Sequence, residues 1–271
     1  MDSGQDFGDR IKRQMNDSGI HDAWEAMYRS DDNERFYELA YAKLFKKLGQ
    51  PRDALALDIG CGIGANTVRL ARQGYRVVAA DYSEAILPET KRNMERHGVA
   101  DRVTIQREDI TALTFPDGHF DLTLCWGVLM HIPAVDAALA ELARVTKPGG
   151  YLVLAEVNPS SPEARTLRGY WRTLKRDKVS IEHKPCGFEH TSRFNDEALF
   201  WRHLDRDWTT KQLGGYGFEP AGRFAGHLIE TFHYFKNAGI RNAIQALNRF
   251  YFSNIGAAAL SSTQVLIYRK R

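Results

Sequence analysis

The sequence predicts an α/β fold built on a doubly wound, mostly parallel sheet. Two observations carry this prediction. Between residues 51 and 157, short apolar segments alternate with segments of helical periodicity, and a glycine-rich turn joins the first apolar segment to the next helix. Strands that alternate with helices of about 10–15 residues form β-α-β units, and strands that are apolar throughout belong to a sheet covered on both faces.

Each element follows from its own pattern. Apolar residues recur at helical spacing within 22–48, which indicates two helices, and Gly49-Gln50-Pro51 ends them before the first strand. After residue 206 the alternation resumes with one helix and two strands, which brings the sheet to seven strands. The predicted strands are 54–60, 75–81, 103–109, 121–127, 151–157, 218–226 and 263–270, and the predicted helices between them are 65–74, 83–98, 133–147 and 208–217.

The pattern divides one predicted domain into a core and the segments added to it. Residues 1–50 form an N-terminal helical cap, 51–157 form the core, and 207–226 with 261–271 complete that core. Insertions at 158–206 and 227–260 leave from carboxyl ends of strands, the side on which open α/β sheets bind ligands. We therefore expect both insertions to form a helical lid over a ligand site.

Composition and charge limit the classes of protein. The chain is 43% hydrophobic and 26% charged, its polar N-terminus does not resemble a targeting peptide, and its three cysteines lack metal-ligand spacing. No apolar run reaches the ~18–20 residues of a membrane span. We expect a cytoplasmic protein without a metal. Residues 1–157 carry a net charge of −5 and residues 158–271 a net charge of +8, so the second part either meets an acidic partner or is solvated.

The glycine-rich turn is the main candidate for a nucleotide site. Glycines at a strand-to-helix turn allow a ligand to approach the backbone closely. The spacing of Gly60, Gly62 and Gly64 differs from the G-x-G-x-x-G pattern of dinucleotide sites, and Asp58 precedes the first glycine by two residues. A carboxylate there would repel a pyrophosphate but attract a ligand that carries an ammonium and a sulfonium.

With these residues, "LDIGCGIG" (57–64) resembles the first motif of class I S-adenosylmethionine-dependent methyltransferases, which have a Rossmann-like fold. Further segments are similar in the same order over about residues 52–157: "VVAAD" (77–81), "REDI" (107–110), "FDLTLCWGVLMHIP" (120–133) and "ALAELARVTKPGGYLVL" (138–154). The resemblance implies S-adenosylmethionine as the cofactor. It also implies the cofactor-binding residues: Asp58, Gly60, Cys61 and Gly62 at the methionine part, Asp81 and Tyr82 at the ribose, Asp109 and Ile110 at the adenine, and Cys125 and Trp126 near the donor. The other interpretations are strand-end capping for Asp58 and Asp81 and a plain tight turn for the glycines.

The N-terminal "WEAMY" resembles the aromatic helix that many such enzymes fold over the methionine end of the cofactor. Trp24 and Tyr28 are therefore included among the cofactor-binding residues. The alternative is that these two aromatic residues, four positions apart, pack together within a helix.

Histidines are the candidates for a catalytic base, because histidine titrates near neutral pH. His131 lies in the loop after the fourth strand, where related enzymes often carry histidines, and His190 lies in the first insertion. A packing or capping role is the alternative for His131. The spacing of His183, Cys186 and His190 fits no usual set of metal ligands, so a polar lid or a solvated loop is favoured over a metal site.

The segment "RTLRGYWRTLKRDK" places Arg165, Arg168, Arg172 and Lys175/Arg176 along one helical stripe. The stripe is either a solvated face with extended side chains or a surface for a phosphate, a carboxylate or an anionic lipid. Nucleic acid is disfavoured because no recognition module accompanies it.

These observations together predict a methyltransferase that moves a methyl group to a hydroxyl, less readily to an amine, of a small acidic or amphipathic acceptor. A sugar, a sugar nucleotide, a glycolipid and a natural product are the acceptor classes considered, and peripheral membrane contact stays open. Two alternatives come from other classes. One is a non-catalytic subunit that binds the cofactor, and the other is a nicotinamide-dependent dehydrogenase or another enzyme that uses the same cofactor differently.

Overall fold

The computed structural model of the protein describes residues 31–49, 53–174, 179–194, 197–235 and 237–271. Trp24, Tyr28 and the Lys175/Arg176 pair lie outside these ranges. The strands are β1 (Leu55–Ile59), β2 (Arg76–Asp81), β3 (Val103–Arg107), β4 (Phe120–Trp126), β5 (Thr146–Val157), β6 (Val179–Lys184), β7 (Gly187–Phe194), β8 (Glu197–Leu204), β9 (Phe218–Ala225) and β10 (Thr263–Lys270). The α-helices are α3 (Asp31–Leu48), α4 (Ala65–Arg72), α5 (Leu87–Arg96), α6 (Val135–Val145), α7 (Pro162–Leu174), α8 (Arg206–Gly215) and α9 (Ala238–Asn254), with short 3₁₀ turns η1 (Ala100–Arg102), η2 (Leu129–His131) and η3 (Thr231–Tyr234).

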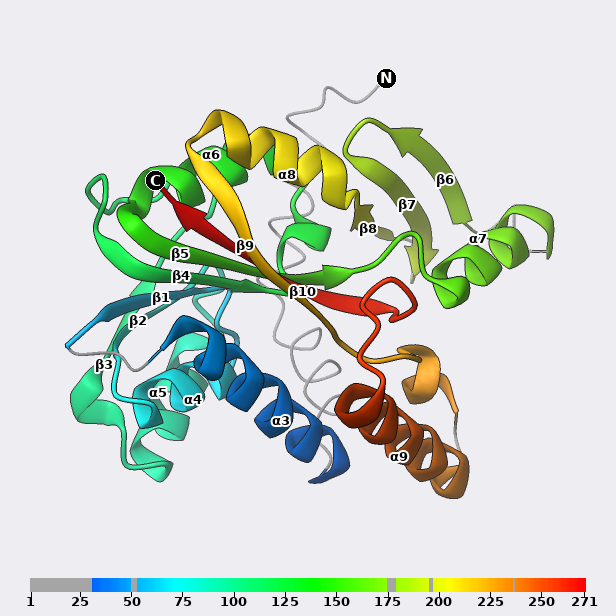
Figure 1. Ribbon diagram of the computed structural model, residues 1–271, viewed down its shortest axis with the longest axis horizontal. Coiled ribbons are helices and arrows are strands. Elements are labelled where there is room, and N and C mark those ends of the chain that lie inside the picture. Colours follow the sequence, from blue (N-terminus) through cyan, green and yellow to red (C-terminus); the bar gives the residue numbers. More distant parts are fainter. Residues whose placement is uncertain (1–30, 50–52, 175–178, 195–196, 236) are drawn as a thin grey trace.

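Seven strands form one sheet in the order β3-β2-β1-β4-β5-β10-β9 (Figure 1). The strands β1 to β5 run parallel, and β10 pairs antiparallel with both β5 and β9. The prediction of a doubly wound, mostly parallel seven-stranded sheet is confirmed. The carboxyl ends of β1, β2, β4 and β5 therefore meet at one edge, as does the end of β9.

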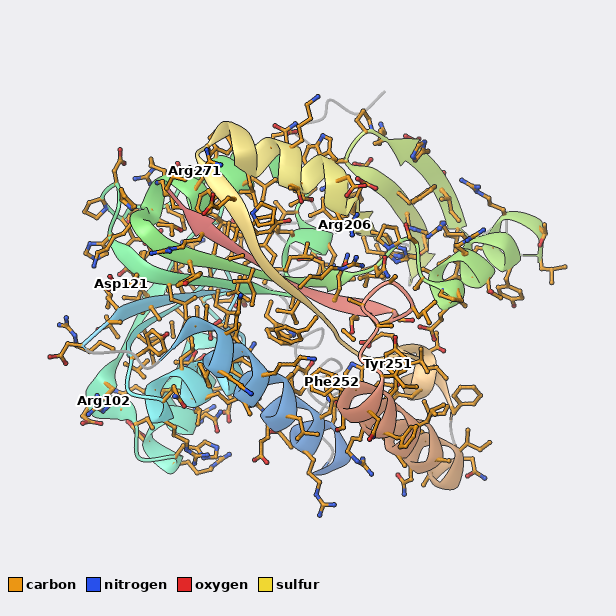
Figure 2. All side chains as sticks on the ribbon, viewed as in Figure 1. Arg102, Asp121, Arg206, Tyr251, Phe252 and Arg271 are labelled. Atoms are coloured by element: carbon orange, nitrogen blue, oxygen red, sulfur yellow. The ribbon has the colours of Figure 1, made fainter. Side chains whose placement is uncertain are left out.

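Apolar side chains cover both faces of the sheet. On one face, residues of α6 and α8 such as Leu139, Leu142 and Leu213 pack against β4 and β5. On the other face lie α3, α4, α5 and α9 (Figure 1), with Phe36 and Leu44 of α3 among the fully buried side chains. Phe252 of α9, labelled in Figure 2, lies 5.2 Å from the Phe36 ring, measured between ring centroids. The core thus fixes the strand ends that carry the candidate site.

The first insertion differs from the helical lid predicted for it. It begins with α7, but β6, β7 and β8 then form a separate antiparallel three-stranded sheet against which α7 packs (Figure 1). Residues 199–204 alternate buried and partly exposed positions only weakly, and histidines and arginines occupy several of the inward ones, so the sequence carried little strand signal. The second insertion is helical as predicted, with η3 and α9.

Smaller differences concern the ends of elements. The predicted helix 83–98 begins only at Leu87, beside Pro88, because Ser83 instead donates its backbone N–H to the Asp81 carboxylate. The predicted strand 103–109 ends at Arg107, and residues 108–110 lie in the following loop. Among the described helices, none combines the length and the apolar character that crossing a membrane would take.

Candidate cofactor and acceptor site

The glycine turn after β1 has the backbone geometry that a bound ligand needs. Gly60, Gly62 and Gly64 all have positive φ angles, of 73°, 52° and 82°. A Cβ atom on Gly60 would stand 2.3 Å from Val128, and one on Gly64 would stand 2.5 Å from Met94, so packing excludes side chains there. At Gly62 nothing lies within 4 Å of such a Cβ, which leaves open space above the turn. The turn therefore presents bare backbone to the cavity at Gly62.

Asp81 ends β2 beside this turn. One carboxylate oxygen accepts the Gly62 N–H at 2.9 Å, and the other accepts the Ser83 N–H at 3.0 Å. Asp81 is 9% exposed and lines the cavity with Cys61 and Tyr82. Each carboxylate oxygen can accept a second hydrogen bond. Asp81 can therefore accept hydrogen bonds from ligand hydroxyl groups while its existing hydrogen bonds stabilise the turn.

Asp58 does not have the position that the resemblance implies. Its side chain is buried in β1, is not among the residues that line the cavity, and accepts a 2.6 Å hydrogen bond from the Thr67 hydroxyl. Burial, opposed by that hydrogen bond and reinforced by the charge of Asp81, raises the pKa of Asp58 to about 7. In this position the carboxyl ties α4 to β1. Cys125 likewise lies in the core with no exposed surface, outside the cavity lining.

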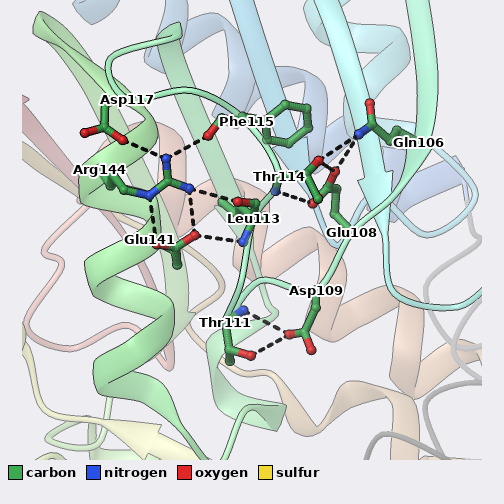
Figure 3. A network of polar contacts seen from close by, with 10 residues as sticks. All are labelled: Gln106, Glu108, Asp109, Thr111, Leu113, Thr114, Phe115, Asp117, Glu141 and Arg144. Carbon is green, nitrogen blue, oxygen red and sulfur yellow. Dashed lines mark hydrogen bonds and ion pairs between the residues drawn. The ribbon is translucent and has the colours of Figure 1, made fainter.

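The predicted adenine segment is held by a polar network (Figure 3). Arg144 of α6 donates to the carbonyl oxygens of Leu113 and Phe115 and pairs with Glu141 and Asp117, at distances of 2.7–2.9 Å. Asp109 accepts hydrogen bonds from the backbone and hydroxyl of Thr111. Asp109 and Ile110 both line the cavity. The network fixes the loop after β3 against α6 and thereby sets where these two residues lie.

An aromatic wall closes the cavity at the end of β4. The Trp126 ring stacks on Tyr41 of α3 at 5.2 Å and lies 5.7 Å from Tyr37, and the Arg69 guanidinium lies over both tyrosine rings. Burial raises the pKa of both tyrosines far above the ordinary value. Trp126 is among the site residues predicted from the sequence, whereas Tyr37 and Tyr41 are not. Their spacing of four residues on a predicted helix places both side chains on one face of that helix.

His131 lies in the η2 turn, which Glu156 of β5 holds through a backbone N–H. His131 lines the cavity, and its Nδ1 lies 3.4 Å from the Phe200 carbonyl oxygen. Burial lowers the pKa of His131 to about 4, so the imidazole is neutral at pH 7. Glu156, at the end of β5, accepts the Leu129 N–H at 3.2 Å, and burial raises its pKa to about 8. Sequence reasoning missed Glu156, which followed an apolar strand as an isolated acid.

His190 does not line the cavity. It is fully buried between α7 and the small sheet, stacked on Trp201 at 5.1 Å and 4.5 Å from the His203 ring. Burial and the charges of Arg168 and Arg172 lower its pKa to about 4. A role for His190 as the base is therefore not supported by its position. Its neighbours Trp171, Trp201 and His203 do line the cavity.

One continuous cavity of about 2030 Å³ joins these parts. It extends from the glycine turn and the loop after β3, past Trp126 and His131, to α7 and the small sheet. Ligand pockets for one small molecule span about 300–1,000 Å³, so this cavity has room for two ligands side by side. No group of three His, Cys, Asp or Glu side chains within the described ranges is arranged to hold a metal ion.

Comparisons with known proteins agree with this geometry. Residues 57–154 match the protein family described as "Methyltransferase domain". A demethylmenaquinone methyltransferase of Thermobifida fusca is 42% identical over 118 residues, which are 42% of this chain and 48% of that protein. A sterol 24-C-methyltransferase of Aspergillus fumigatus is 25% identical over 231 residues, 73% of this chain and 61% of that protein.

A solved structure of a SAM-dependent methyltransferase from Methanosarcina mazei has the same fold. It superposes with a TM-score of 0.58 at 19% identity and covers 85% of this chain and 97% of that one. Residues 57–154 are therefore similar to methyltransferase domains, and the fold is that of a SAM-dependent methyltransferase structure. The chain spans between about a third and two thirds of the length of the curated relatives it matches. The nicotinamide-dehydrogenase alternative has no support.

Proposed function

We propose that the protein transfers a methyl group from S-adenosylmethionine to a hydroxyl of a small anionic or amphipathic acceptor. The observation that carries the proposal is the single cavity. Its first part is lined by Gly60, Gly62, Asp81 and Asp109, which suit the cofactor, and its second part is built by the insertion. Methyl transfer needs the two substrates in one dry space, in line with each other, and the cavity offers such a space.

The residues of the first part fit the cofactor. The bare backbone at Gly62 leaves room above the turn, and both Asp81 oxygens retain acceptor capacity for a pair of ribose hydroxyls. Ile110 is an apolar surface for a flat base, and Asp109 is the acid next to it. The cofactor, when bound, supplies a methyl group on a positively charged sulfur, and the tyrosine-backed Trp126 ring excludes water beside it.

The insertion supports an anionic acceptor. Arg168 is 7% exposed, its guanidinium lies 4.1 Å from the Phe188 ring, and one nitrogen donates to the Pro159 carbonyl at 2.6 Å. Its other terminal nitrogen and both nitrogens of His190 find no hydrogen-bond partner among the described residues. A buried cation without a counter-ion is costly. Arg168 does not itself line the cavity, but Leu167, the residue before it on α7, does, so a carboxylate or phosphate of an acceptor bound beside α7 would reduce this cost.

A carbon acceptor is the second candidate. The sterol 24-C-methyltransferase of Aspergillus fumigatus methylates carbon by its name, and its similarity extends over 73% of this chain. An amine acceptor and a non-catalytic cofactor-binding subunit are the remaining alternatives. All three alternatives predict cofactor binding. The carbon and amine acceptors differ from a hydroxyl in the atom that is methylated, and the non-catalytic subunit forms no methylated product.

The test is a methyl-transfer screen with the purified full chain and methyl-labelled S-adenosylmethionine. The acceptors are matched sets of phenols, hydroxy acids, amines and polyprenyl or sterol alkenes, each with and without a carboxylate or phosphate. We expect label in hydroxyl compounds, with the anionic member of each pair preferred. Label only in amines or in carbon would overturn the hydroxyl proposal. Binding without release of S-adenosylhomocysteine in any set, including cell extract, would favour the non-catalytic subunit.

A further inference from the structure

Two buried polar side chains face the cavity from opposite positions on adjacent strands. Glu156 of β5 and Gln264 of β10 are direct partners in the antiparallel register, so their side chains project from the same face of the sheet. Both are at most 3% exposed, and both line the cavity. Neither was predicted from the sequence.

Three of their polar atoms lack a hydrogen-bond partner among the described residues. These atoms are Oε2 of Glu156 and both amide atoms of Gln264. A buried polar group without a partner costs about 1–3 kcal/mol, and such groups are rare in native proteins. Two of them side by side on a cavity wall indicate a place where a ligand completes the hydrogen bonds.

The neighbouring cation does not complete them. Arg202 of β8 is buried next to Glu156, but its nitrogens donate to the carbonyls of Ile132 and Pro133 and pair with Glu189 at 2.5 Å. The other oxygen of Glu156 holds the η2 turn through the Leu129 N–H. Glu156 Oε2 is therefore the oxygen that remains for a ligand.

The pair matches the chemistry of one hydroxyl group. A hydroxyl donates one hydrogen bond and accepts others, so it can donate to Glu156 Oε2 and accept from the Gln264 amide. An ammonium or a protonated amine could donate to both but could not accept from Gln264. Ala155, the residue before Glu156, pairs with Trp126, so Glu156 projects from the other face of the sheet, on the side of Cys125 and the η2 turn.

We propose that Glu156 and Gln264 bind the reacting hydroxyl of the acceptor and that Glu156 removes its proton. This inference rests on the proposed function. As the O–H bond breaks, the proton goes to Glu156 Oε2, and the oxygen electron pair forms a bond to the methyl carbon. The carbon–sulfur bond breaks at the same time, and its electrons remain on sulfur as a neutral thioether. Gln264 orients the oxygen through its N–H.

The acid–base properties of the two candidate bases support this assignment. Burial raises the pKa of Glu156 to about 8, against the opposing charge of Arg202, whereas burial lowers the pKa of His131 to about 4. A base works best when its pKa is near the working pH, and a base of pKa about 4 accepts protons poorly. The titratable and charged groups that act on Glu156 are Arg202 of β8 and Cys125 of β4, and the backbone N–H groups of Leu129 and Met130 also face it.

The test compares Glu156→Gln with Glu95→Gln as a matched control. Glu95 is an exposed acid of α5 outside the cavity lining. The Gln side chain at 156 can still accept the Leu129 N–H, so the fold of the η2 turn is preserved. Gln264→Leu removes the orienting amide. The probes are S-adenosylhomocysteine for binding and, for turnover, the best hydroxyl compound of the screen.

We expect Glu156→Gln to lower kcat by about 10²–10⁴-fold, the contribution of a positioned base. Gln264→Leu should lower kcat/KM for the hydroxyl compound, and Glu95→Gln should have little effect. Affinity for S-adenosylhomocysteine should stay within about twofold in all three. Infrared difference spectra of wild type against Glu156→Gln should show a buried carboxyl that loses its proton near pH 8.

Two outcomes would overturn the inference. One is a Glu156→Gln enzyme that methylates the hydroxyl compound at the wild-type rate, and the other is a Gln264→Leu enzyme whose kcat/KM for that compound equals the wild-type value. If the wild type methylates no hydroxyl compound at all, the proposed function fails first and the inference fails with it. A wild type that methylates a hydroxyl compound together with an unaffected Glu156→Gln enzyme contradicts the inference alone.

Discussion

At Asp81 one carboxylate has two tasks that a substitution can separate. It accepts N–H groups from Gly62 and Ser83, and it faces the cavity where a ribose would lie. Asp81→Asn keeps the size of the side chain but removes the charge and one acceptor oxygen. We expect affinity for S-adenosylhomocysteine to fall by about 1.5–3 kcal/mol, the usual effect of losing a hydrogen bond to a charged group. Titration calorimetry measures it.

The control for Asp81 is Asp101→Asn, since Asp101 is an exposed acid in η1 outside the cavity lining. Its affinity for S-adenosylhomocysteine should equal that of the wild type. Equal affinity in Asp81→Asn as well would show that Asp81 only caps its strand, the alternative that the sequence left open.

Substitutions of Arg168 and Arg165 test whether the basic stripe binds the acceptor. The sequence placed both on one stripe, but the structure buries Arg168 against Phe188 and leaves Arg165 exposed. Arg168→Gln should raise KM for the anionic member of each acceptor pair by about tenfold or more and leave KM of the neutral member nearly unchanged. Arg165→Gln should change neither. Equal effects on anionic and neutral acceptors would show that Arg168 only supports the packing of α7.

At the scale of single elements, the loop after β3 depends on Arg144 of α6 (Figure 3). Its guanidinium bridges two loop carbonyls and two carboxylates, and the Glu141 pairing lowers the pKa of Glu141. Arg144→Gln leaves the carbonyls of Leu113 and Phe115 without donors. We expect a loss of about 1–3 kcal/mol in unfolding free energy and weaker binding of S-adenosylhomocysteine. Urea unfolding and calorimetry measure the two effects.

A matched change outside this network is Lys147→Gln. Lys147 forms an ion pair with Asp121 at 2.9 Å, both side chains are 39% exposed, and neither lies in the loop after β3. Exposed pairs contribute little, so stability should change by less than about 1 kcal/mol and ligand affinity should not change. Similar affinity losses in both variants would argue that the loop does not position the adenine site.

The helices and strands differ in how far their sequence patterns predict the fold and the site. Apolar strands and the glycine turn have strong local patterns, so the core sheet and the cavity-facing residues Gly62, Asp81 and Ile110 were predictable. The small β6–β8 sheet was not, because its inward positions carry His190, Arg202 and His203 in place of apolar residues. Glu156 and Gln264 were missed for another reason. Their significance depends on cross-strand register between distant segments, which a single sequence does not display.

At the scale of the whole molecule, buried titratable groups make stability depend on pH in two opposed ways. His131, His190 and His203 have pKa values lowered by burial, to about 4 for the first two. Asp58 and Glu156 have pKa values raised by burial, to about 7 and about 8. In each set, the folded and unfolded chains bind different numbers of protons at the same pH.

The histidines stabilise the fold above about pH 6.5, where the unfolded chain also leaves them neutral. As pH falls from 6.5 towards 4, the unfolded chain binds protons that the folded one does not, so this stability is lost. The two acids act in reverse: their contribution is complete below about pH 4 and is lost as pH rises through 7 and 8. Between pH 4 and 6.5 the unfolded chain binds protons on three histidines that stay neutral in the folded chain. Over the same range the folded chain keeps protons on two acids that are ionised in the unfolded chain.

We therefore predict a stability maximum near pH 6.5. Below it, these groups should lower the unfolding free energy by about 1 kcal/mol per pH unit, the effect of one net proton, and above it the two acids should lower it again. Urea unfolding at pH 5 to 8.5 measures the curve. Glu156→Gln cannot ionise, so it should flatten the alkaline side and, by removing one of the two opposing protons, make the acid side steeper. His203→Phe should flatten the acid side alone. If stability instead rises steadily from pH 6.5 to 8.5 in the wild type, the Asp58 and Glu156 carboxyls are ionised in the folded protein over that range, which contradicts the raised pKa of both groups.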